Sequence, residues 1–157
     1  MGEKSVVAFR LNGEDVDLDV PSDSTLLYVL AYDANALGPK YGCGKSQCGS
    51  CTVLIDGDPV RSCDVRVSAA SGRHVTTLAG LRETDGTPGP LQRAMIAEQA
   101  AQCGFCTSGA IMQAQALLDR NPNPTESEVR SALNEILCRC GTQNRIVRAV
   151  LRAAEEM

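Results

Sequence analysis

The chain has 157 residues, a formal net charge of −4, an aromatic fraction of 3% and no tryptophan. Nucleic-acid binding requires a basic face and aromatic side chains for base stacking, so this composition argues against a nucleic-acid partner. Residues 1–20 alternate apolar and charged side chains and lack the apolar core of a secretory signal, and no later segment is apolar enough to span a membrane. We therefore expect a cytoplasmic protein without direct membrane insertion, unless a partner with its own signal exports or anchors the folded chain.

The first half of the chain has the pattern of strands with one helix. Alternating side chains over residues 6–20, about the turn Asn12-Gly13, predict a β-hairpin. The turn Asp56-Gly57 predicts a second hairpin over residues 52–63, and a helix is predicted over residues 25–31. Two hairpins and one helix suit a β-grasp domain.

The second half has helical periodicity and follows a segment rich in glycine and proline. Its four predicted helices cover residues 91–101, 108–119, 125–137 and 146–151. We therefore predict an α+β fold in which a β-grasp domain precedes a four-helix bundle. The predicted divisions are a first domain at residues 1–78, a linker at 79–90 and a second domain at 91–157.

All eight cysteines fall into two groups of four, and none is left over. The first quartet has the spacing C-x4-C-x2-C followed by a fourth cysteine after a short gap, which is the spacing with which plant-type ferredoxins hold a [2Fe-2S] cluster. The second quartet reads C-x2-C, a long gap and C-x-C. The first quartet consists of Cys43, Cys48, Cys51 and Cys63, and the second of Cys103, Cys106, Cys138 and Cys140.

An even number of cysteines is also typical of disulfide-bonded and zinc-binding proteins. Disulfides are disfavoured because the chain carries no secretory signal and is long enough to build a core without them. Zinc sites use two short paired knuckles, whereas three cysteines of the first quartet crowd into one loop. Gly42, Gly44 and Gly49 permit a backbone whose N–H groups point at a cluster, so this quartet favours iron–sulfur. The spacing of the second quartet, considered alone, leaves iron–sulfur and zinc open.

Three runs of sequence surround the cysteines: Gly42-Cys-Gly-Lys-Ser-Gln-Cys-Gly-Ser-Cys-Thr-Val53, Gln102-Cys-Gly-Phe-Cys-Thr-Ser-Gly109 and Cys138-Arg-Cys-Gly-Thr142. Together they resemble the signatures of the small iron–sulfur subunit of molybdenum hydroxylases, the xanthine oxidase and aldehyde oxidoreductase family. The resemblance covers nearly the whole chain and implies a plant-ferredoxin-like domain joined to a helical-bundle domain, each with one [2Fe-2S] cluster. Gly38-Pro-Lys-Tyr-Gly42 and the segment 141–145 look most like the bacterial nicotinate dehydrogenase and isoquinoline 1-oxidoreductase branch.

The resemblance implies that this chain is the electron-transfer subunit of a larger oxidoreductase. In that family, electrons leave the molybdopterin centre singly, through the C-terminal cluster and then the N-terminal cluster. The first quartet would therefore hold the acceptor-side cluster and the second the molybdenum-side cluster, while Gln102 and Cys140 would also lie against the pterin. The implied cofactors are two [2Fe-2S] clusters and a molybdopterin of the cytosine dinucleotide type, held mainly by a large partner subunit. The implied acceptor is a flavin subunit or a c-type cytochrome.

The resemblance also suggests the chemistry of the whole enzyme, although this chain has no catalytic residue of its own. The expected substrate is an N-heteroaromatic compound such as a nicotinate-like molecule, with an aldehyde as the second choice. A different class of function is a stand-alone two-cluster ferredoxin or redox-sensing module, which would expose its second cluster without a partner. A zinc-stabilised interaction protein is the more distant alternative, and its lack of colour would distinguish it.

Overall fold

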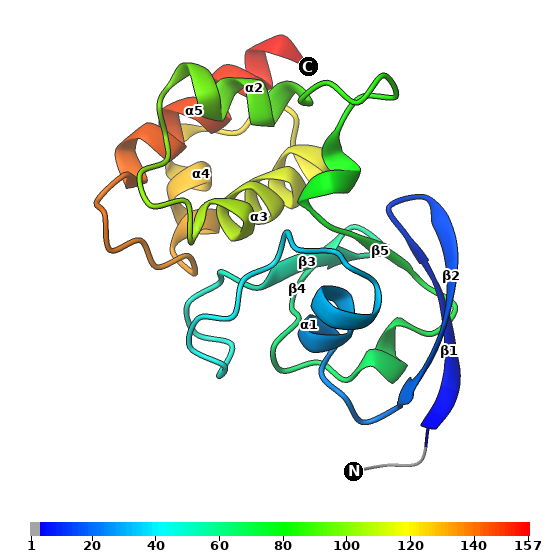
Figure 1. Ribbon diagram of the computed structural model, residues 1–157. Helices are drawn as coiled ribbons and strands as arrows, with labels where there is room; N and C mark the ends of the chain where they lie inside the picture. Colours follow the sequence, from blue (N-terminus) through cyan, green and yellow to red (C-terminus); the bar gives the residue numbers. More distant parts are fainter. Residues whose placement is uncertain (1–3) are drawn as a thin grey trace.

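The computed structural model describes residues 4–157, so the first three residues of the predicted N-terminal domain lie outside the described part. Within residues 4–157 a β-sheet unit is followed by a helical unit, and the two pack against each other (Figure 1). The fold is α+β, with a β-grasp unit and a helical bundle, as the sequence predicts. Among the helices of this range, none is long and apolar enough to cross a membrane.

The N-terminal unit is built on a mixed sheet with the strand order β2-β1-β5-β3-β4. Strands β1 and β5 run parallel, and the other neighbouring pairs run antiparallel. Both predicted hairpins are present, and both have a residue of positive φ followed by a glycine of positive φ in the turn, as two-residue hairpins prefer. The strands are β1 (Lys4–Leu11), β2 (Glu14–Pro21), β3 (Thr52–Ile55), β4 (Asp58–Arg61) and β5 (His74–Thr76).

A short helical segment covers one face of this sheet (Figure 1). The helix predicted over residues 25–31 is one turn of α-helix, α1 (Leu26–Tyr28), which continues as a π-helical turn, η1 (Val29–Asp33). The wider turn forms because the N–H of Ala34 donates to the carbonyl of Val29, five residues earlier. It keeps Leu26 and Leu30 fully buried over the sheet. A 3-10 turn, η2 (Val67–Ala70), completes this core.

The C-terminal unit contains four α-helices within residues 4–157, as predicted, and they share one apolar core. Each helix contributes fully or largely buried side chains, among them Leu91, Ile111, Val129 and Val150. The helices are α2 (Pro90–Ala97), α3 (Thr107–Arg120), α4 (Glu126–Leu133) and α5 (Gln143–Glu156).

Two predicted helices end earlier than their periodicity indicates. α2 ends at Ala97 because Gln99 takes a left-handed backbone conformation with φ of 48°. α4 ends at Leu133, not at residue 137, because the N–H of Leu137 donates to the carbonyl of Cys48 at 3.0 Å. A contact with the other unit therefore replaces the last turn of this helix.

The segment between the two units is partly ordered by packing. A 3-10 turn, η3 (Leu78–Leu81), overlaps the beginning of the predicted linker, and Pro90 at its end is the first residue of α2. Leu78 and Leu81 pack against a small core of Leu54 from β3 with Met112 and Ala116 from α3. This core joins the sheet to the bundle.

One arginine reinforces the same interface with polar contacts. The guanidinium of Arg61 on β4 donates to Thr52 Oγ1 at 2.5 Å, to Gln113 Oε1 at 3.1 Å and to Glu135 Oε2 at 2.7 Å. Its side chain is only 12% exposed. Because the guanidinium is multiply bonded and largely shielded from water, it holds β3, α3 and the segment after α4 in one arrangement.

We expect Met112→Ala to weaken the joint between the two units. Removing a buried side chain that is 1% exposed leaves a cavity and should lower the free energy of unfolding by about 2–5 kcal/mol. Urea denaturation followed by far-UV circular dichroism measures the change. Ile96→Ala is the matched control because Ile96 is 68% exposed, and it should change stability by about 0.5 kcal/mol or less. Equal effects of the two variants would contradict a joint built on Met112.

Candidate metal centres

The first quartet lies in the loop between η1 and β3, with its fourth member just after β4. The loop folds around the sulfur of Cys43, which accepts the backbone N–H groups of Lys45 at 3.4 Å, Gln47 at 3.2 Å and Cys48 at 3.3 Å. The N–H of Cys43 in turn donates to Cys48 Sγ at 3.4 Å. Backbone donors directed at sulfur are what a thiolate ligand requires, because they stabilise its negative charge.

Glycines make this loop possible, as predicted from the sequence. A Cβ on Gly42 would lie 2.6 Å from Cys48 Sγ, and a Cβ on Gly44, which has φ of 65°, would lie 2.6 Å from the hydroxyl of Tyr41. Gly49 has φ of 75°, and a Cβ there would lie 2.4 Å from Ile136 Cδ1. The loop therefore closes around sulfur and against the helical unit only where no side chain intervenes.

The second quartet gathers at one end of the helical unit. Cys103 and Cys106 precede α3, and Cys106 is the residue that caps it, while Cys138 and Cys140 lie between α4 and α5. Cys106 is buried, Cys103 is exposed, and the other two are of intermediate exposure. The long sequence gap between the two halves of this quartet is closed by the packing of α3 against α4 and α5.

Within each quartet the thiols meet as two pairs. Side-chain hydrogen bonds join Cys43 with Cys48, Cys51 with Cys63, Cys103 with Cys140 and Cys106 with Cys138. Within residues 4–157, no three His, Cys, Asp or Glu side chains converge on a position for one metal ion. A [2Fe-2S] cluster places two ligands on each of its two irons. Two adjacent thiol pairs fit that requirement in both quartets.

The surroundings give the thiols different proton affinities. Backbone N–H donors, foremost that of Lys45, lower the pKa of Cys43 to about 7. Burial raises the pKa of Cys51 to about 11 and that of Cys106 to about 12. Burial also acts to raise the pKa of Cys138, but hydrogen bonds to Thr142 outweigh it and bring that pKa to about 7. Each quartet therefore combines one thiol that ionises readily with one that needs a metal ion to ionise near neutral pH.

The two cysteine loops touch each other directly. Besides the hydrogen bond from Leu137 to the carbonyl of Cys48, the start of α3 packs so closely on the first loop that a Cβ on Gly109 would lie 2.0 Å from the carbonyl oxygen of Gly49. The ring of Phe105, next to Cys106, lies over Gly42, where a Cβ would be 3.6 Å from Phe105 Cε1. The two candidate centres are thus held at a spacing set by backbone contacts.

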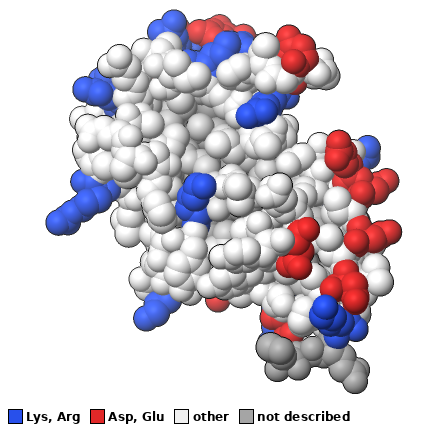
Figure 2. Space-filling view, viewed as in Figure 1, with Lys and Arg blue, Asp and Glu red and all other residues white. Residues whose placement is uncertain are grey.

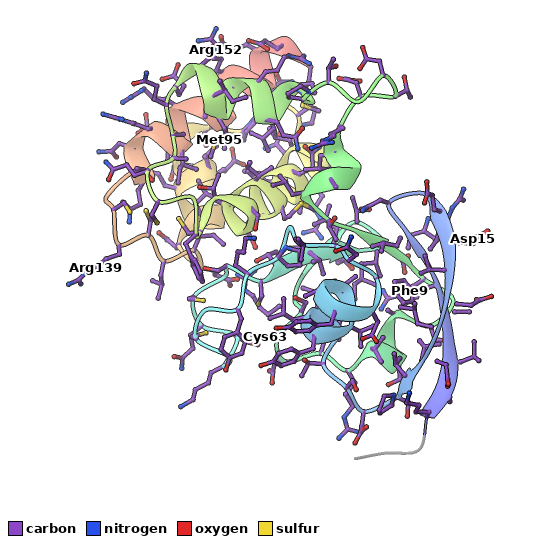
Figure 3. The ribbon with its side chains drawn as sticks, viewed as in Figure 1. Phe9, Asp15, Cys63, Met95, Arg139 and Arg152 are labelled. Carbon is purple, nitrogen blue, oxygen red and sulfur yellow. The ribbon has the colours of Figure 1, made fainter. Side chains whose placement is uncertain are left out.

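Gln102 and Cys140 lie on the outer side of the second quartet. Gln102 is exposed beside Cys103, and its side chain makes no hydrogen bond within residues 4–157. Cys140 is of intermediate exposure. Figure 3 shows Arg139, which lies between the two cysteines of the C-x-C pair, extending away from the helical unit, whereas Cys63 lies beneath the first loop. The amide of Gln102 is therefore free to bind an external group.

Carboxylates are scarce in the segments that carry the quartets. Residues 34–55, 99–118 and 136–154, which include seven of the eight cysteines, contain two lysines and four arginines but no Asp or Glu. Asp64, which follows Cys63, is held by the hydroxyl of Ser46. Many of the acidic side chains lie on the β1–β2 hairpin instead, at the right of Figure 2. Four thiolates concentrate negative charge, and further carboxylates would add repulsion, so this distribution suits anionic centres.

Two hydroxyl groups near sulfur were not identified from the sequence. Ser50 and Thr142 are both 3% exposed and contact Cys48 and Cys138, respectively. Ser50 lies inside the C-x2-C pair of the first motif, and Thr142 follows Cys140 by two residues, so the motifs contain them. The spacing of a motif does not indicate where a hydroxyl points, because that direction is set by the tertiary fold.

We expect Gly49→Ala to separate the two loops. The new methyl group would meet Ile136 and, at 2.7 Å, the carbonyl oxygen of Glu135, so the variant should lose iron and stability. Gly57→Ala is the matched control, because Gly57 has φ of 85° but nothing within 4 Å of the added Cβ. It should cost only about 1–2 kcal/mol of backbone strain. Iron content per chain and the thermal midpoint test this, and equal iron contents in the two variants would contradict it.

Thiol reactivity in the iron-free chain should follow the pKa values. The thiolate is the reactive form, so alkylation of Cys43 and Cys138 by iodoacetamide should rise through a midpoint near the pKa of about 7. Cys51 and Cys106 should remain slow until the pH approaches their pKa values of about 11 and about 12. Peptide mass spectrometry after timed alkylation gives the rates. Eight cysteines that react with one common pH profile would show that the loops form only around iron.

Comparison with known proteins identifies the family. A family model described as "2Fe-2S iron-sulfur cluster binding domain" matches residues 9–79, and one described as "[2Fe-2S] binding domain" matches residues 77–151. A small subunit of nicotinate dehydrogenase from Pseudomonas putida is 49% identical over 97% of this chain and 96% of its own length. The alpha subunit of isoquinoline 1-oxidoreductase from Brevundimonas diminuta is 46% identical over 96% of this chain and 99% of its own length.

Solved structures agree with these sequence matches. Aldehyde oxidoreductase from Desulfovibrio desulfuricans matches 97% of this chain with a TM-score of 0.91 and 41% identity, using 17% of its own length. Quinoline 2-oxidoreductase from Pseudomonas putida matches 99% of this chain and 98% of the matched chain, with a TM-score of 0.89 and 34% identity. The two matched domains, the thiol pairs and these relatives lead to one conclusion. The chain belongs to the family of small [2Fe-2S] iron–sulfur subunits of molybdenum hydroxylases.

Proposed function

We propose that this chain carries electrons through two [2Fe-2S] clusters, the first quartet holding the acceptor-side cluster and the second the molybdenum-side cluster. The observation that supports this most strongly is that each quartet forms two adjacent thiol pairs. When bound, each cluster accepts and releases one electron, so two clusters can pass on in single steps the two electrons that hydroxylation yields. The division into residues 1–78, 79–90 and 91–157 belongs to the same proposal.

The residues of this chain would hold each cluster between a shielded side and an exposed side. Cys51, Cys63 and Cys106 are buried, which excludes water from the inner thiols. The two loops meet at Cys48 and Leu137, so the inner sides face each other. The exposed Cys103 marks the outer side of the second quartet, where a partner can approach. This arrangement supports entry of electrons at the second quartet and exit at the first.

The partners follow from the same reasoning. We propose a large partner subunit that holds molybdopterin of the cytosine dinucleotide type, with Gln102 and Cys140 directed toward the pterin. The free amide of Gln102 supports this, because it can donate and accept hydrogen bonds at an exposed position next to Cys103. A flavin subunit or a c-type cytochrome would accept electrons from the first cluster. A cytoplasmic location remains part of the proposal.

The substrate class of the whole enzyme is proposed from its relatives. The names of two of them refer to nicotinate and isoquinoline, and both are matched over nearly their full length. The small subunit of nicotine 6-hydroxylase from Paenarthrobacter nicotinovorans is a further relative, 43% identical over 92% of this chain. We propose an N-heteroaromatic substrate ahead of an aldehyde, with the substrate bound by the large subunit.

Single ligand replacements should affect one cluster each. The reduced protein should give two distinct S = 1/2 signals in electron paramagnetic resonance (EPR) spectra, and Cys51→Ser should remove one of them. Cys106→Ser, the matched variant in the other quartet, should remove the other signal. Spin quantification of the reduced complex measures both effects. Loss of both signals in either variant, or the absence of any signal in the native protein, would contradict two separately held clusters.

A further inference from the structure

Each quartet has one sulfur that faces a buried hydroxyl. Ser50 Oγ lies 3.7 Å from Cys48 Sγ in the first quartet, and Thr142 Oγ1 lies 3.2 Å from Cys138 Sγ in the second. Ser50 and Thr142 are each 3% exposed, so water does not compete strongly for these contacts. The two loops have unrelated folds, and both place a hydroxyl on a cysteine sulfur.

The position of Thr142 shows that its hydroxyl is used for the sulfur and not for the helix. Thr142 is the N-cap residue of α5, where a threonine side chain usually accepts an N–H of the first turn, yet it makes no such bond. Thr125, the N-cap of α4, does make it, accepting the N–H of Glu128 at 3.3 Å. The same residue type at the same helical position is thus used in two ways, and the one near a cysteine is turned toward sulfur.

The hydroxyl of Ser50 is also distinct from its neighbours. Thr52 Oγ1 donates to the carbonyl of Gly49 at 2.6 Å, and Ser46 Oγ donates to Asp64 Oδ2 at 3.1 Å. Those two hydroxyls stabilise the backbone and the surface of the loop. The hydroxyl of Ser50, in contrast, is directed at a cysteine sulfur.

We propose that Ser50 and Thr142 donate hydrogen bonds to Cys48 and Cys138 when these sulfurs bind iron, and that each raises the reduction potential of its own cluster. A ligating sulfur has lost its proton and can only accept, so the hydroxyl becomes the donor. Reduction adds negative charge to the cluster, and a donor on its sulfur stabilises the reduced form more than the oxidised form. The inference rests on the proposed function, in which each quartet holds a cluster.

Two positioning residues on two centres let the chain set the two potentials separately. A donor on Cys138 makes the molybdenum-side cluster easier to reduce, and a donor on Cys48 does the same for the acceptor-side cluster. The hydroxyl contact at Cys138 is shorter than that at Cys48, at 3.2 Å against 3.7 Å. Because shorter hydrogen bonds are stronger, removal of the Thr142 hydroxyl should have the larger effect.

The test is a potentiometric titration of the two EPR signals in the intact complex. In Thr142→Val, one signal should require a lower potential, with a shift of about tenfold in its ratio of oxidised to reduced cluster at a fixed potential, which for one electron is about 59 mV. The second signal should not move. In Ser50→Ala the second signal should shift down and the first should not. Thr142→Ser keeps a hydroxyl and should restore the native potential, and Thr142→Ala replaces the valine variant if that variant does not fold.

Thr125→Val is the matched control. It removes the hydroxyl of a helix-capping threonine that is not in contact with a cysteine, so it should lower stability without shifting either potential. Two native signals whose potentials stay unchanged in Thr142→Val and Ser50→Ala would overturn this inference and leave the proposed function standing. A native protein without two signals would overturn both.

Discussion

The hydrogen bond from the N–H of Leu137 to the carbonyl of Cys48 is the contact on which the rest of the arrangement depends. Cys48 belongs to the first quartet, and Leu137 immediately precedes Cys138 of the second, so a single backbone contact couples the two loops. It ends α4 early, and it requires Gly49, where a side chain would collide with Ile136. Because the contact is made by backbone atoms, its spacing does not depend on flexible side chains.

The remainder of the interface supports that contact. The apolar core around Met112 positions α3 on β3, and Arg61 ties the sheet to Glu135, next to the segment that carries the second pair of cysteines. Many of the acidic groups lie on another surface, that of the β1–β2 hairpin (Figure 2). The chain thus combines a rigid joint between two anionic centres with surroundings that add little to their charge.

Much of this could be predicted from the sequence because the relevant signals are local. The hairpin turns, the glycines of the first loop and the capping box at Thr125 depend on residues a few positions apart. The end of α4 at Leu133 could not be predicted, because it is set by a carbonyl that lies far away in the sequence. The roles of Ser50 and Thr142 were missed for a related reason. A hydroxyl can serve a helix or a sulfur, and only the tertiary fold decides which.

The central claim is that this chain serves a molybdenum enzyme by holding two [2Fe-2S] clusters. The most direct test is to purify the native complex through a tag on this chain and to measure its molybdenum and iron contents together with its visible spectrum. We expect about four irons per chain, stoichiometric molybdenum and a co-purifying large subunit, with flavin or haem bands that identify the acceptor. Iron without molybdenum and without a large partner would contradict the claim and would make the chain an independent ferredoxin.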